Sequence, residues 1–397
     1  MANVSSSNGL EKRPKLRFPG FDEPWKMVSL QDISEYRKNK ICVSKLKYIS
    51  TENMLQNFAG IIPYTSEEDI SGVEFCVGDT LLANIRPYLR KAWLATHDGA
   101  CSTDVLALCP SDITPAFLNN IIEQDRFIDY VMSGVKGSKM PRGDKAHILA
   151  YETAIPSLLE QEKINSFMQL LHQRIAKIQM EIELLKKYKR GLVSQILKQR
   201  LAISHEDDEW KEVCLSDVAE GFEYGLNAAA TAYDGKHKYI RITDIDDDTH
   251  AYINQDPVSP SGAFEERYRV RENDILFART GASVGKSYLY CKNDGDLFFA
   301  GFLIRIHVKE GVDGEYVFLN TLTEEYDKWV LLESARSGQP GINAEQYRKY
   351  RFKLPSLNTQ RRIATIARNI DVQIQKEALH LRLLQKQKAG LLQQLFI

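Results

Sequence analysis

The sequence predicts two α/β (α+β) domains in tandem duplicate, each followed by a long helix, with the two helices paired as an antiparallel coiled coil. Three observations lead to this fold class. A series of short motifs occurs twice in the same order, each copy opens with strand-like and loop-like segments, and each copy closes with a long stretch of coiled-coil spacing. The 397 residues also exceed what one ordinary hydrophobic core holds, so two or three domains are expected.

The overall composition argues against several classes of protein. Apolar residues make up 43% and charged residues 26% of the chain, which is typical of soluble globular proteins. The sequence contains no run of eighteen apolar residues, the length that a membrane-spanning helix would need. Residues 1–10 are rich in Ser and Asn and lack an apolar signal core, so we expect a cytoplasmic protein without a membrane partner. The formal net charge is −1, so any nucleic-acid surface must come from local clusters of basic residues.

Metal and redox chemistry have little support in the sequence. The six cysteines include no Cys-x-x-Cys pair, which argues against a zinc finger, a redox motif and a dense disulfide framework. The acidic run His205–Glu209 is expected to be a solvated connector rather than a metal site. Asp244–Asp248 resembles the start of a calcium loop, but Thr249 stands where Gly is needed and Gln255 where a bidentate Glu is needed, so we predict a turn.

The internal repeat begins at Trp25 and again at Trp210. Trp25–Ile33 and Trp210–Val218 are identical at five of nine positions. Two further motif pairs follow in the same order, Tyr48–Asn53 with Tyr239–Asp244 and Gly78–Ala83 with Asn273–Ala278. From Pro156 and Pro355 onward the copies align without a gap over 42 residues, of which 14 pairs are identical. The offset between copies grows from 185 to 199, so the globular parts differ by insertions while the terminal parts keep a fixed length.

This alignment predicts five segments along the chain. They are a polar N-terminal tail over residues 1–20, a first globular domain over 21–155, a first spacer helix with the start of the acidic linker over 156–203, a second globular domain over 204–354, and a second spacer helix over 355–397.

Within each globular copy, short apolar runs predict the strands. Leu82–Ile85 and Ile275–Phe277 lie beside turn residues, as buried strands do, and Phe298–Phe299 with Phe302–Val308 resembles another strand pair. The segments with helical spacing are Pro115–Val131 and Gly314–Leu332.

After each of the prolines Pro156 and Pro355, apolar residues recur at steps of three and four, which is the seam of a coiled coil. The seam positions of the first copy are Ile164, Met168, Leu171, Ile175, Ile178, Ile182, Leu185, Leu192 and Ile196, and those of the second copy include Ile363, Ala367, Ile370, Ile374, Leu381, Leu384, Leu391 and Leu395. Lys189 and Lys388 interrupt the seam at the same position, where a polar residue costs stability and can fix register. Two ordinary core helices are the alternative, but a mean helix has only about 11–12 residues.

Basic loops containing glycine or polar residues occur at two corresponding places in each copy. One loop follows a predicted strand (Asn84–Lys91 and Arg279–Ser287), and the other precedes the long helix (Ser133–Arg142 and Arg336–Asn343). Arg, Gln and Asn make bidentate contacts to guanine and adenine edges, whereas Lys fixes the register on phosphates. For any one residue, an ordinary basic surface loop is the alternative. The residues from which we predict DNA contacts are Arg86, Arg90, Lys91, Lys136, Ser138, Lys139, Arg142, Arg241, Arg279, Thr280, Ser283, Lys286, Arg336, Gln339 and Asn343.

Catalytic motifs are missing from the sequence. Gly281–Ser287 resembles a P-loop, but three residues separate its glycines where four are needed. The sequence contains no Gly-x-Ser-x-Gly elbow, no His-Glu-x-x-His helix, no glycine-rich cofactor loop after a strand and no Asn-Pro-Pro-Tyr-like adenine methylation motif. We therefore predict a non-catalytic recognition subunit. Two alternatives stay open, namely a degenerate NTPase that uses Gly281–Ser287 and a coiled-coil structural adaptor without a DNA role of its own.

A family resemblance rests on short motifs in doubled order. These are Pro14–Pro19 followed by Trp25, Tyr48–Leu55, Ala278–Lys286, Pro156–Gln161 with its counterpart Pro355–Gln360, and the helix ends Lys189–Leu192 and Lys388–Leu391. In these motifs the chain resembles the specificity subunit of a type I restriction–modification enzyme, and the resemblance covers nearly the whole sequence.

The resemblance implies two target recognition domains that each read one half of a bipartite, asymmetric DNA site, with the helices setting the spacing. It implies double-stranded DNA, two methyltransferase subunits and two motor-nuclease subunits as partners. S-adenosylmethionine, ATP and Mg would be bound by those partners, and this chain would hold no cofactor or metal. The first copy lacks the Arg-Thr-Gly run of the second and has Arg86–Tyr88 instead, so the two half-sites are expected to differ.

Overall fold

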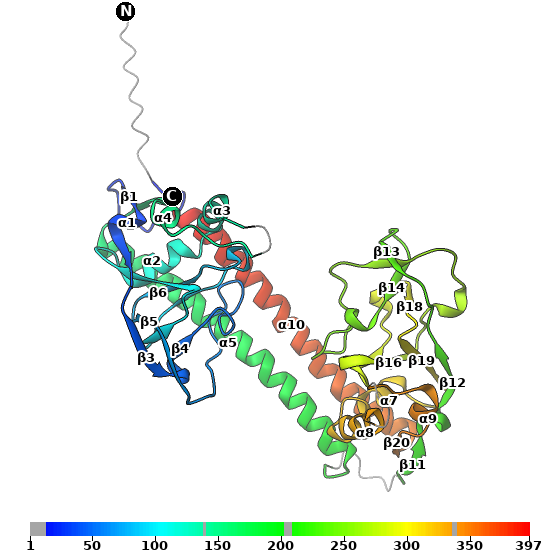
Figure 1. The fold of residues 1–397 in the computed structure, drawn as a ribbon. Helices are drawn as coiled ribbons and strands as arrows, with labels where there is room; N and C mark the ends of the chain where they lie inside the picture. Colours follow the sequence, from blue (N-terminus) through cyan, green and yellow to red (C-terminus); the bar gives the residue numbers. More distant parts are fainter. Residues whose placement is uncertain (1–12, 138–139, 202–208, 336–339) are drawn as a thin grey trace, which may run out of the picture. The chain divides into compact units, whose positions relative to one another are not determined.

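The computed structural model describes residues 13–137, 140–201, 209–335 and 340–397 (Figure 1). The chain divides into two compact units: unit 1 comprises residues 1–179 and 379–397, and unit 2 comprises residues 180–378. Both boundaries fall inside the long helices α5 (Leu158–Leu197) and α10 (Leu357–Leu395). Each unit therefore contains the beginning of one long helix and the end of the other.

Unit 1 contains two four-stranded sheets and one strand pair. The first sheet has the order β2-β9-β6-β7 and is antiparallel throughout, and the second has the order β3-β5-β8-β4 with β4 and β8 parallel. The strands are β1 (Lys26–Ser29), β2 (Ser34–Tyr36), β3 (Lys40–Ser44), β4 (Tyr48–Ile49), β5 (Asp69–Phe75), β6 (Thr80–Ala83), β7 (Ala92–Leu94), β8 (Gly99–Cys101), β9 (Val105–Pro110) and β10 (Glu152–Ile155). The short helices are α1 (Leu30–Ile33), α2 (Pro115–Ile122), α3 (Asp125–Ser133) and α4 (Lys145–Leu149).

Unit 2 contains one four-stranded sheet, β12-β19-β16-β17, and three strand pairs. The strands are β11 (Lys211–Cys214), β12 (Ala219–Tyr224), β13 (Ala230–Ala232), β14 (Lys238–Ile240), β15 (Val258–Pro260), β16 (Asp274–Ala278), β17 (Ser287–Leu289), β18 (Leu297–Phe299), β19 (Leu303–Val308) and β20 (Arg351–Leu354). The short helices are α6 (Leu215–Val218), α7 (Gly314–Asn320), α8 (Glu324–Ser334) and α9 (Ala344–Arg348).

The two units use the same strand order at corresponding places. The sheet β2-β9-β6-β7 of unit 1 has its counterpart in β12-β19-β16-β17 of unit 2, and the pair β1·β10 has its counterpart in β11·β20. In both sheets the third strand of that order, β6 or β16, is buried along its whole length. The basic loop that the sequence places after each strand therefore starts from a buried, fixed position.

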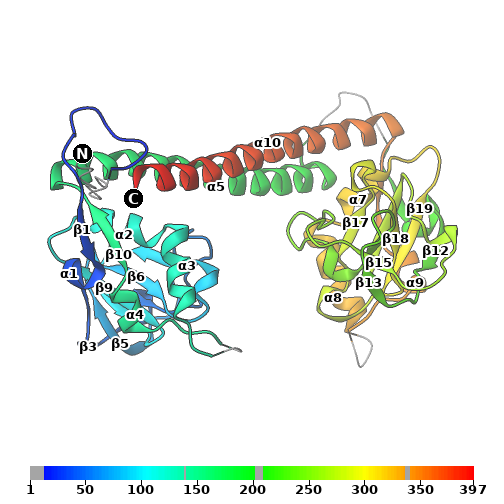
Figure 2. The same ribbon diagram turned by 90° about the horizontal axis from the view of Figure 1, so that it is seen from above.

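The core of unit 1 includes the beginning of α5 and the end of α10. Ile164 and Met168 of α5 share one apolar cluster with Leu392 and Leu395 of α10. Phe396 lies in the same core, with its ring centroid 4.9 Å from that of Phe117 and 6.3 Å from that of Trp25. Figures 1 and 2 show the red end of α10 beside the beginning of α5 in this unit. The beginning of one long helix thus packs with the end of the other.

The core of unit 2 has the reverse arrangement. Val193 and Ile196 near the end of α5 share an apolar cluster with Ile363 and Ala367 near the beginning of α10. This cluster also contains residues of β16, β19 and α7, so the helix ends are part of the globular core rather than attached to its surface. In neither unit does the described structure contain a helix long and apolar enough to cross a lipid bilayer.

The segments Pro115–Val131 and Gly314–Leu332, for which the sequence predicted helical structure, each contain two helices. Residues 115–131 divide into α2 and α3 because Gln124, at the N-cap position of α3, adopts an extended conformation, and its side chain makes no capping hydrogen bond. Residues 314–332 divide into α7 and α8 because the Thr323 side chain accepts a hydrogen bond from Tyr326 N and caps α8. Apolar spacing continues across both breaks, so the capping residues alone signal them.

Two strand predictions also need correction. Phe298–Phe299 and Phe302–Val308 correspond to β18 and β19, but these strands do not pair with each other: β18 pairs with β14 in parallel, and β19 pairs with β12 and β16. The strand predicted over Leu82–Ile85 is β6 and ends at Ala83, because Asn84 and Ile85 already make the contacts of the following loop. The core segment Ile275–Phe277 lies within β16 as predicted.

Candidate nucleic-acid interface

In unit 1, the two basic loops predicted from sequence lie side by side. Ile85, just after β6, forms an antiparallel bridge with Arg142. Arg86 N donates to Pro141 O at 2.8 Å, and Gly143 N donates to Asn84 O at 3.1 Å. The loop after β6 and the loop before α4 therefore form one continuous surface element.

In unit 2, the corresponding loops make the same kind of contact. Thr280, just after β16, forms an antiparallel bridge with Gly341. Gly281 N donates to Pro340 O at 3.2 Å, and Ile342 N donates to Arg279 O at 2.9 Å. The sequence identified the four loops separately, and the structure joins them into one pair in each unit.

Of the eight predicted DNA-contacting cations that the structure describes, five are held by carboxylates of their own unit. The pairs are Arg90 with Asp125, Lys136 with Asp144, Arg142 with Asp104, Arg241 with Asp244, and Lys286 with Asp247. An ion-paired cation presents less positive charge to phosphate, because part of its charge is already neutralised.

Lys91 and Lys286 align in the repeat, and each forms a hydrogen bond to the main chain of its own unit. Lys91 Nζ donates to Thr51 O at 2.7 Å, and Lys286 Nζ donates to Ile245 O at 2.9 Å. The side chain of Lys286 is only 10% exposed. Both lysines thus tie the basic loop to the main chain of a preceding segment.

Arg86 and Arg279 differ from the other predicted cations. Neither forms an ion pair with any residue that the structure describes. Arg86 is exposed, and Arg279 lies over the ring of Tyr224 with its guanidinium carbon 5.0 Å from the ring centroid. Each unit thus places one uncompensated arginine beside its pair of loops.

The polar members of the predicted set occupy several positions. Thr280 takes part in the bridge to Gly341, the half-buried Ser283 lies in the short turn after it, and the exposed Asn343 caps α9 by accepting a hydrogen bond from Gln346 N. Ser138, Lys139, Arg336 and Gln339 lie outside the described residues.

The glycines of the P-loop-like run have a structural explanation. Gly281 and Gly285 adopt left-handed φ angles of +75° and +88°. A Cβ on Gly285 would lie 2.6 Å from the Val330 side chain of α8, so only glycine allows this close approach. The run therefore serves a tight turn packed against a helix.

The acidic run that resembles a calcium loop is a turn, as predicted. The Asp246 carboxylate accepts hydrogen bonds from the main-chain nitrogens of Asp248 and Thr249. Among the residues with described positions, no three His, Cys, Asp or Glu side chains are grouped to hold a metal ion.

Comparison with known proteins identifies the family. Residues 207–382 match the family model of the type I restriction modification DNA specificity domain. Over these residues the chain carries a domain of the type I restriction–modification specificity family. The resemblance seen in the sequence motifs is thereby confirmed.

Two curated proteins that this chain is similar to are type I specificity subunits. The EcoDI subunit of Escherichia coli is 31% identical over 91 residues, which are 23% of this chain and 20% of that subunit. The MjaVIII subunit of Methanocaldococcus jannaschii is 22% identical over 390 residues, which are 90% of this chain and 87% of that subunit. The chain thus spans only about a fifth of the first of these relatives and most of the second.

Two solved structures have a fold similar to that of this chain. One chain, from a study of complex assembly and conformational transition of the type I R-M system, has a TM-score of 0.56 with 17% identity and covers 95% of this chain and 98% of its own length. The S subunit from M. genitalium has a TM-score of 0.55 with 14% identity and covers 97% of this chain and 99% of its own length. At these identities the likeness concerns the fold.

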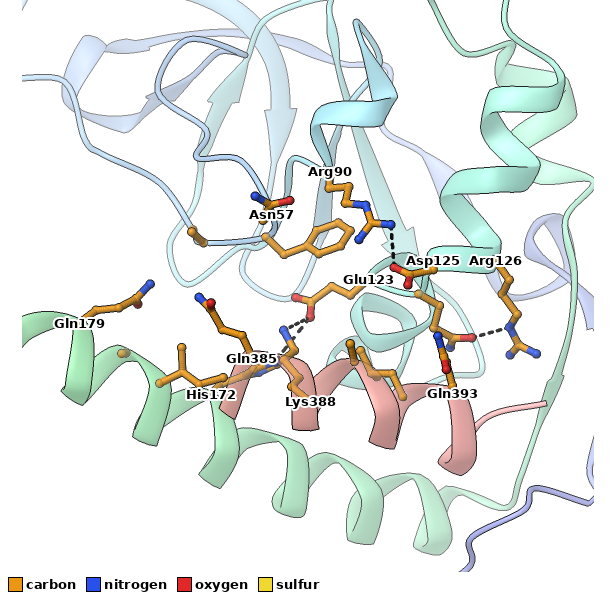
Figure 3. A pocket seen from close by; sticks show the side chains of 18 of the residues that line it. Asn57, Arg90, Glu123, Asp125, Arg126, His172, Gln179, Gln385, Lys388 and Gln393 are labelled. Carbon is orange, nitrogen blue, oxygen red and sulfur yellow. Dashed lines mark hydrogen bonds and ion pairs between the residues drawn. The ribbon is translucent and has the colours of Figure 1, made fainter. Parts of the chain in front are cut away.

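A cluster of the buried Glu123 with the half-buried His172 and Lys388 joins the globular part of unit 1 to both long helices (Figure 3). Lys388 Nζ of α10 lies 2.5 Å from Glu123 Oε2, and His172 Nε2 of α5 lies 3.5 Å from the same oxygen. The other oxygen of Glu123 accepts a hydrogen bond from Asn119 at 2.9 Å. The Glu123 side chain is 6% exposed and lies at the edge of a cavity of about 770 Å³.

The second interrupting lysine has a different partner. In unit 2, Lys189 Nζ of α5 lies 2.5 Å and 2.7 Å from the two carboxylate oxygens of Asp371 of α10, whose side chain is 38% exposed. Asp371 aligns with His172 in the repeat. The two seam lysines are thus neutralised by carboxylates from different parts of the fold, which the sequence did not indicate.

The Glu123 cluster predicts a pH dependence of the stability of unit 1. Burial alone would raise the pKa of Glu123, but the contacts with His172 and Lys388 outweigh it and lower the pKa from 4.5 to about 2. A depressed carboxyl pKa stabilises the folded state above the unfolded-state pKa and loses that contribution as pH falls toward the folded-state pKa. We expect about 3 kcal/mol to be lost between about pH 4.5 and pH 2.

Urea denaturation of the full chain between pH 6 and pH 3 measures this contribution. The stability difference between the wild type and Glu123→Gln should be constant above about pH 5 and should shrink below pH 4.5. A difference that does not change with pH over this range would contradict the assignment.

Proposed function

We propose that this chain is the non-catalytic DNA specificity subunit of a type I restriction–modification system. Unit 1 and unit 2 each read one half of a bipartite, asymmetric site. The observation that carries the proposal is the pairing of two basic loops beside an uncompensated arginine in each unit. Main-chain amides and lysines suit phosphate oxygens, and arginines suit base edges, so one such surface serves both positioning and reading.

The matched strand orders of the two units support a tandem duplicate. Insertions that change the offset between the copies from 185 to 199 lie in the globular parts, where different DNA sequences would have to be read. At the corresponding positions after the buried strand, unit 1 has Asn84 and Ile85 whereas unit 2 has Arg279 and Thr280. Two different half-sites follow from these differences.

The long helices serve, in this proposal, as an antiparallel coiled-coil spacer. In each unit the beginning of one helix packs with the end of the other, as antiparallel pairing requires. The gap-free alignment of the helical segments is also what a spacer of fixed length requires. At about 1.5 Å per residue, helices of this size are on the order of 55–60 Å long, which exceeds the roughly 34–36 Å of one DNA turn.

The chemistry of the system is assigned to partners. Two methyltransferase subunits that carry S-adenosylmethionine would dock along the helices and methylate adenine N6, for which the adenine has to leave the base stack. Two motor-nuclease subunits would supply ATP- and Mg-dependent translocation and cleavage. We place the assembly in the cytoplasm, where its DNA substrate is.

A selection from randomised duplex DNA tests this function. The full-length chain, alone and together with a type I adenine methyltransferase subunit, is incubated with the library, and bound duplexes are sequenced. We expect two short defined blocks separated by a fixed number of unspecified base pairs. No enrichment in the presence of the methyltransferase would instead favour a structural adaptor without a DNA role.

A further inference from the structure

The main chain of Arg279 is hydrogen-bonded within unit 2, while its guanidinium has no carboxylate partner among the described residues. Its main-chain nitrogen donates to Phe302 O at 3.1 Å, and its carbonyl accepts from Ile342 N at 2.9 Å. The side chain forms no ion pair, and its Nε has no hydrogen-bond partner, among the residues that the structure describes. The backbone is therefore fixed on both sides while the guanidinium keeps its donors.

Tyr224 at the end of β12 packs against that guanidinium. Its ring lies under Arg279, and its hydroxyl accepts a hydrogen bond from Ala344 N at 3.2 Å, at the first residue of α9. A guanidinium stacks well on an aromatic face, because the ring attracts the positive charge. Tyr224 thus connects three segments of the predicted interface: β12, the loop after β16 and the start of α9.

Phe302, whose carbonyl accepts the hydrogen bond from the Arg279 main chain, carries an exposed apolar ring. It lies in the turn between β18 and β19, and its side chain is 60% exposed although it is a large apolar residue. In unit 1 the corresponding main-chain contact is Asn84 N to Asp104 O at 2.8 Å, and Asp104 is ion-paired with Arg142. The same position therefore carries an aromatic ring in one unit and an acidic group in the other.

We propose that Tyr224 is a positioning residue for Arg279, and that this stacked pair, with Phe302 beside it, selects guanine in the half-site read by unit 2. The inference rests on the proposed function. A guanidinium held in one plane can give two parallel hydrogen bonds to O6 and N7 of guanine in the major groove. An exposed phenyl ring next to it suits the methyl group of a neighbouring thymine.

Site selection with randomised duplex DNA tests the inference, using full-length Tyr224→Leu, Tyr224→Phe and Arg279→Lys variants. We expect Arg279→Lys to reduce the preference for one guanine by about 5- to 100-fold, in line with the loss of a bidentate pair. Tyr224→Leu should weaken the preference at the same position by about 2- to 5-fold, because the stack is lost. Tyr224→Phe keeps the ring and should retain the preference, while Phe302→Ala should weaken the position next to the guanine.

The controls separate this inference from the proposed function. Each variant is first shown to keep the wild-type melting temperature, and the half-site of unit 1 serves as an internal reference that should not change. If the wild type selects a bipartite site but Tyr224→Leu leaves every position unchanged, the positioning role is wrong and the DNA function stands. If Tyr224→Phe is as impaired as Tyr224→Leu, the hydroxyl rather than the stack is responsible, which also overturns the inference. A wild type that selects no site contradicts the function itself.

Discussion

Replacement of Lys388 by methionine is expected to lower the free energy of unfolding of unit 1 by about 3–5 kcal/mol. The variant leaves the Glu123 carboxylate buried without its main countercharge, and removing one partner of a buried pair costs more than the pair itself contributes. Urea denaturation of the full chain measures the change, and hydrogen exchange of residues 115–133 assigns it to unit 1.

The repeat supplies a matched control for this substitution. Lys189→Met removes the lysine at the corresponding seam position, but its partner Asp371 is 38% exposed and remains solvated. The expected cost is about 1 kcal/mol. The double variant Glu123→Gln with Lys388→Met should recover part of the stability lost in Lys388→Met, because no charge is left buried. Equal, small effects of both lysine substitutions would mean that the Glu123 cluster does not hold unit 1 to the helices.

Arg279→Ala is expected to relax DNA selection in only one half-site, with about 10- to 100-fold loss of discrimination at a single base position. Arg279 combines an uncompensated charge with a fixed backbone beside the loop pair of unit 2, and alanine removes all of its hydrogen-bond donors. Selection from randomised duplex DNA, compared position by position with the wild type, gives the change.

The corresponding variant of unit 1 is the control for Arg279→Ala. Arg86→Ala should affect only the other half-site, because Arg86 lies beside the loop pair of unit 1. A third variant, Lys286→Ala, should instead destabilise unit 2, because Lys286 is tied to Ile245 and Asp247. If Arg279→Ala changed both half-sites equally, the assignment of one half-site to each unit would be wrong.

The features that the sequence revealed are the ones that repeat along it. The seam spacing after Pro156 and Pro355 indicated the two long helices, which run over Leu158–Leu197 and Leu357–Leu395. The buried strand Asp274–Ala278 was visible because an apolar run lies beside turn residues. Such signals are local, so one sequence is enough to find them.

The features that the sequence did not reveal depend on distant partners. The breaks at Gln124 and Thr323 rest on single capping residues within continuous helical spacing. Glu123 was missed because its partner Lys388 is 265 positions away. Tyr224 was missed because nothing near it in sequence indicates that Arg279 will lie over its ring. Several cations predicted to contact DNA are paired with acidic residues that no periodic pattern connects to them.

The central proposal is that a helical spacer sets the distance between two DNA-recognising units. A site selection with lengthened helices tests it most directly. Seven residues, one coiled-coil repeat, are inserted after Gln179 and seven more after Ala378, at the two boundaries between the units. The insertion adds about 10 Å to each helix, so we predict the same two half-sites separated by about three more unspecified base pairs. Two unchanged half-sites at the original separation, or one continuous recognition block in the wild type, would contradict the account.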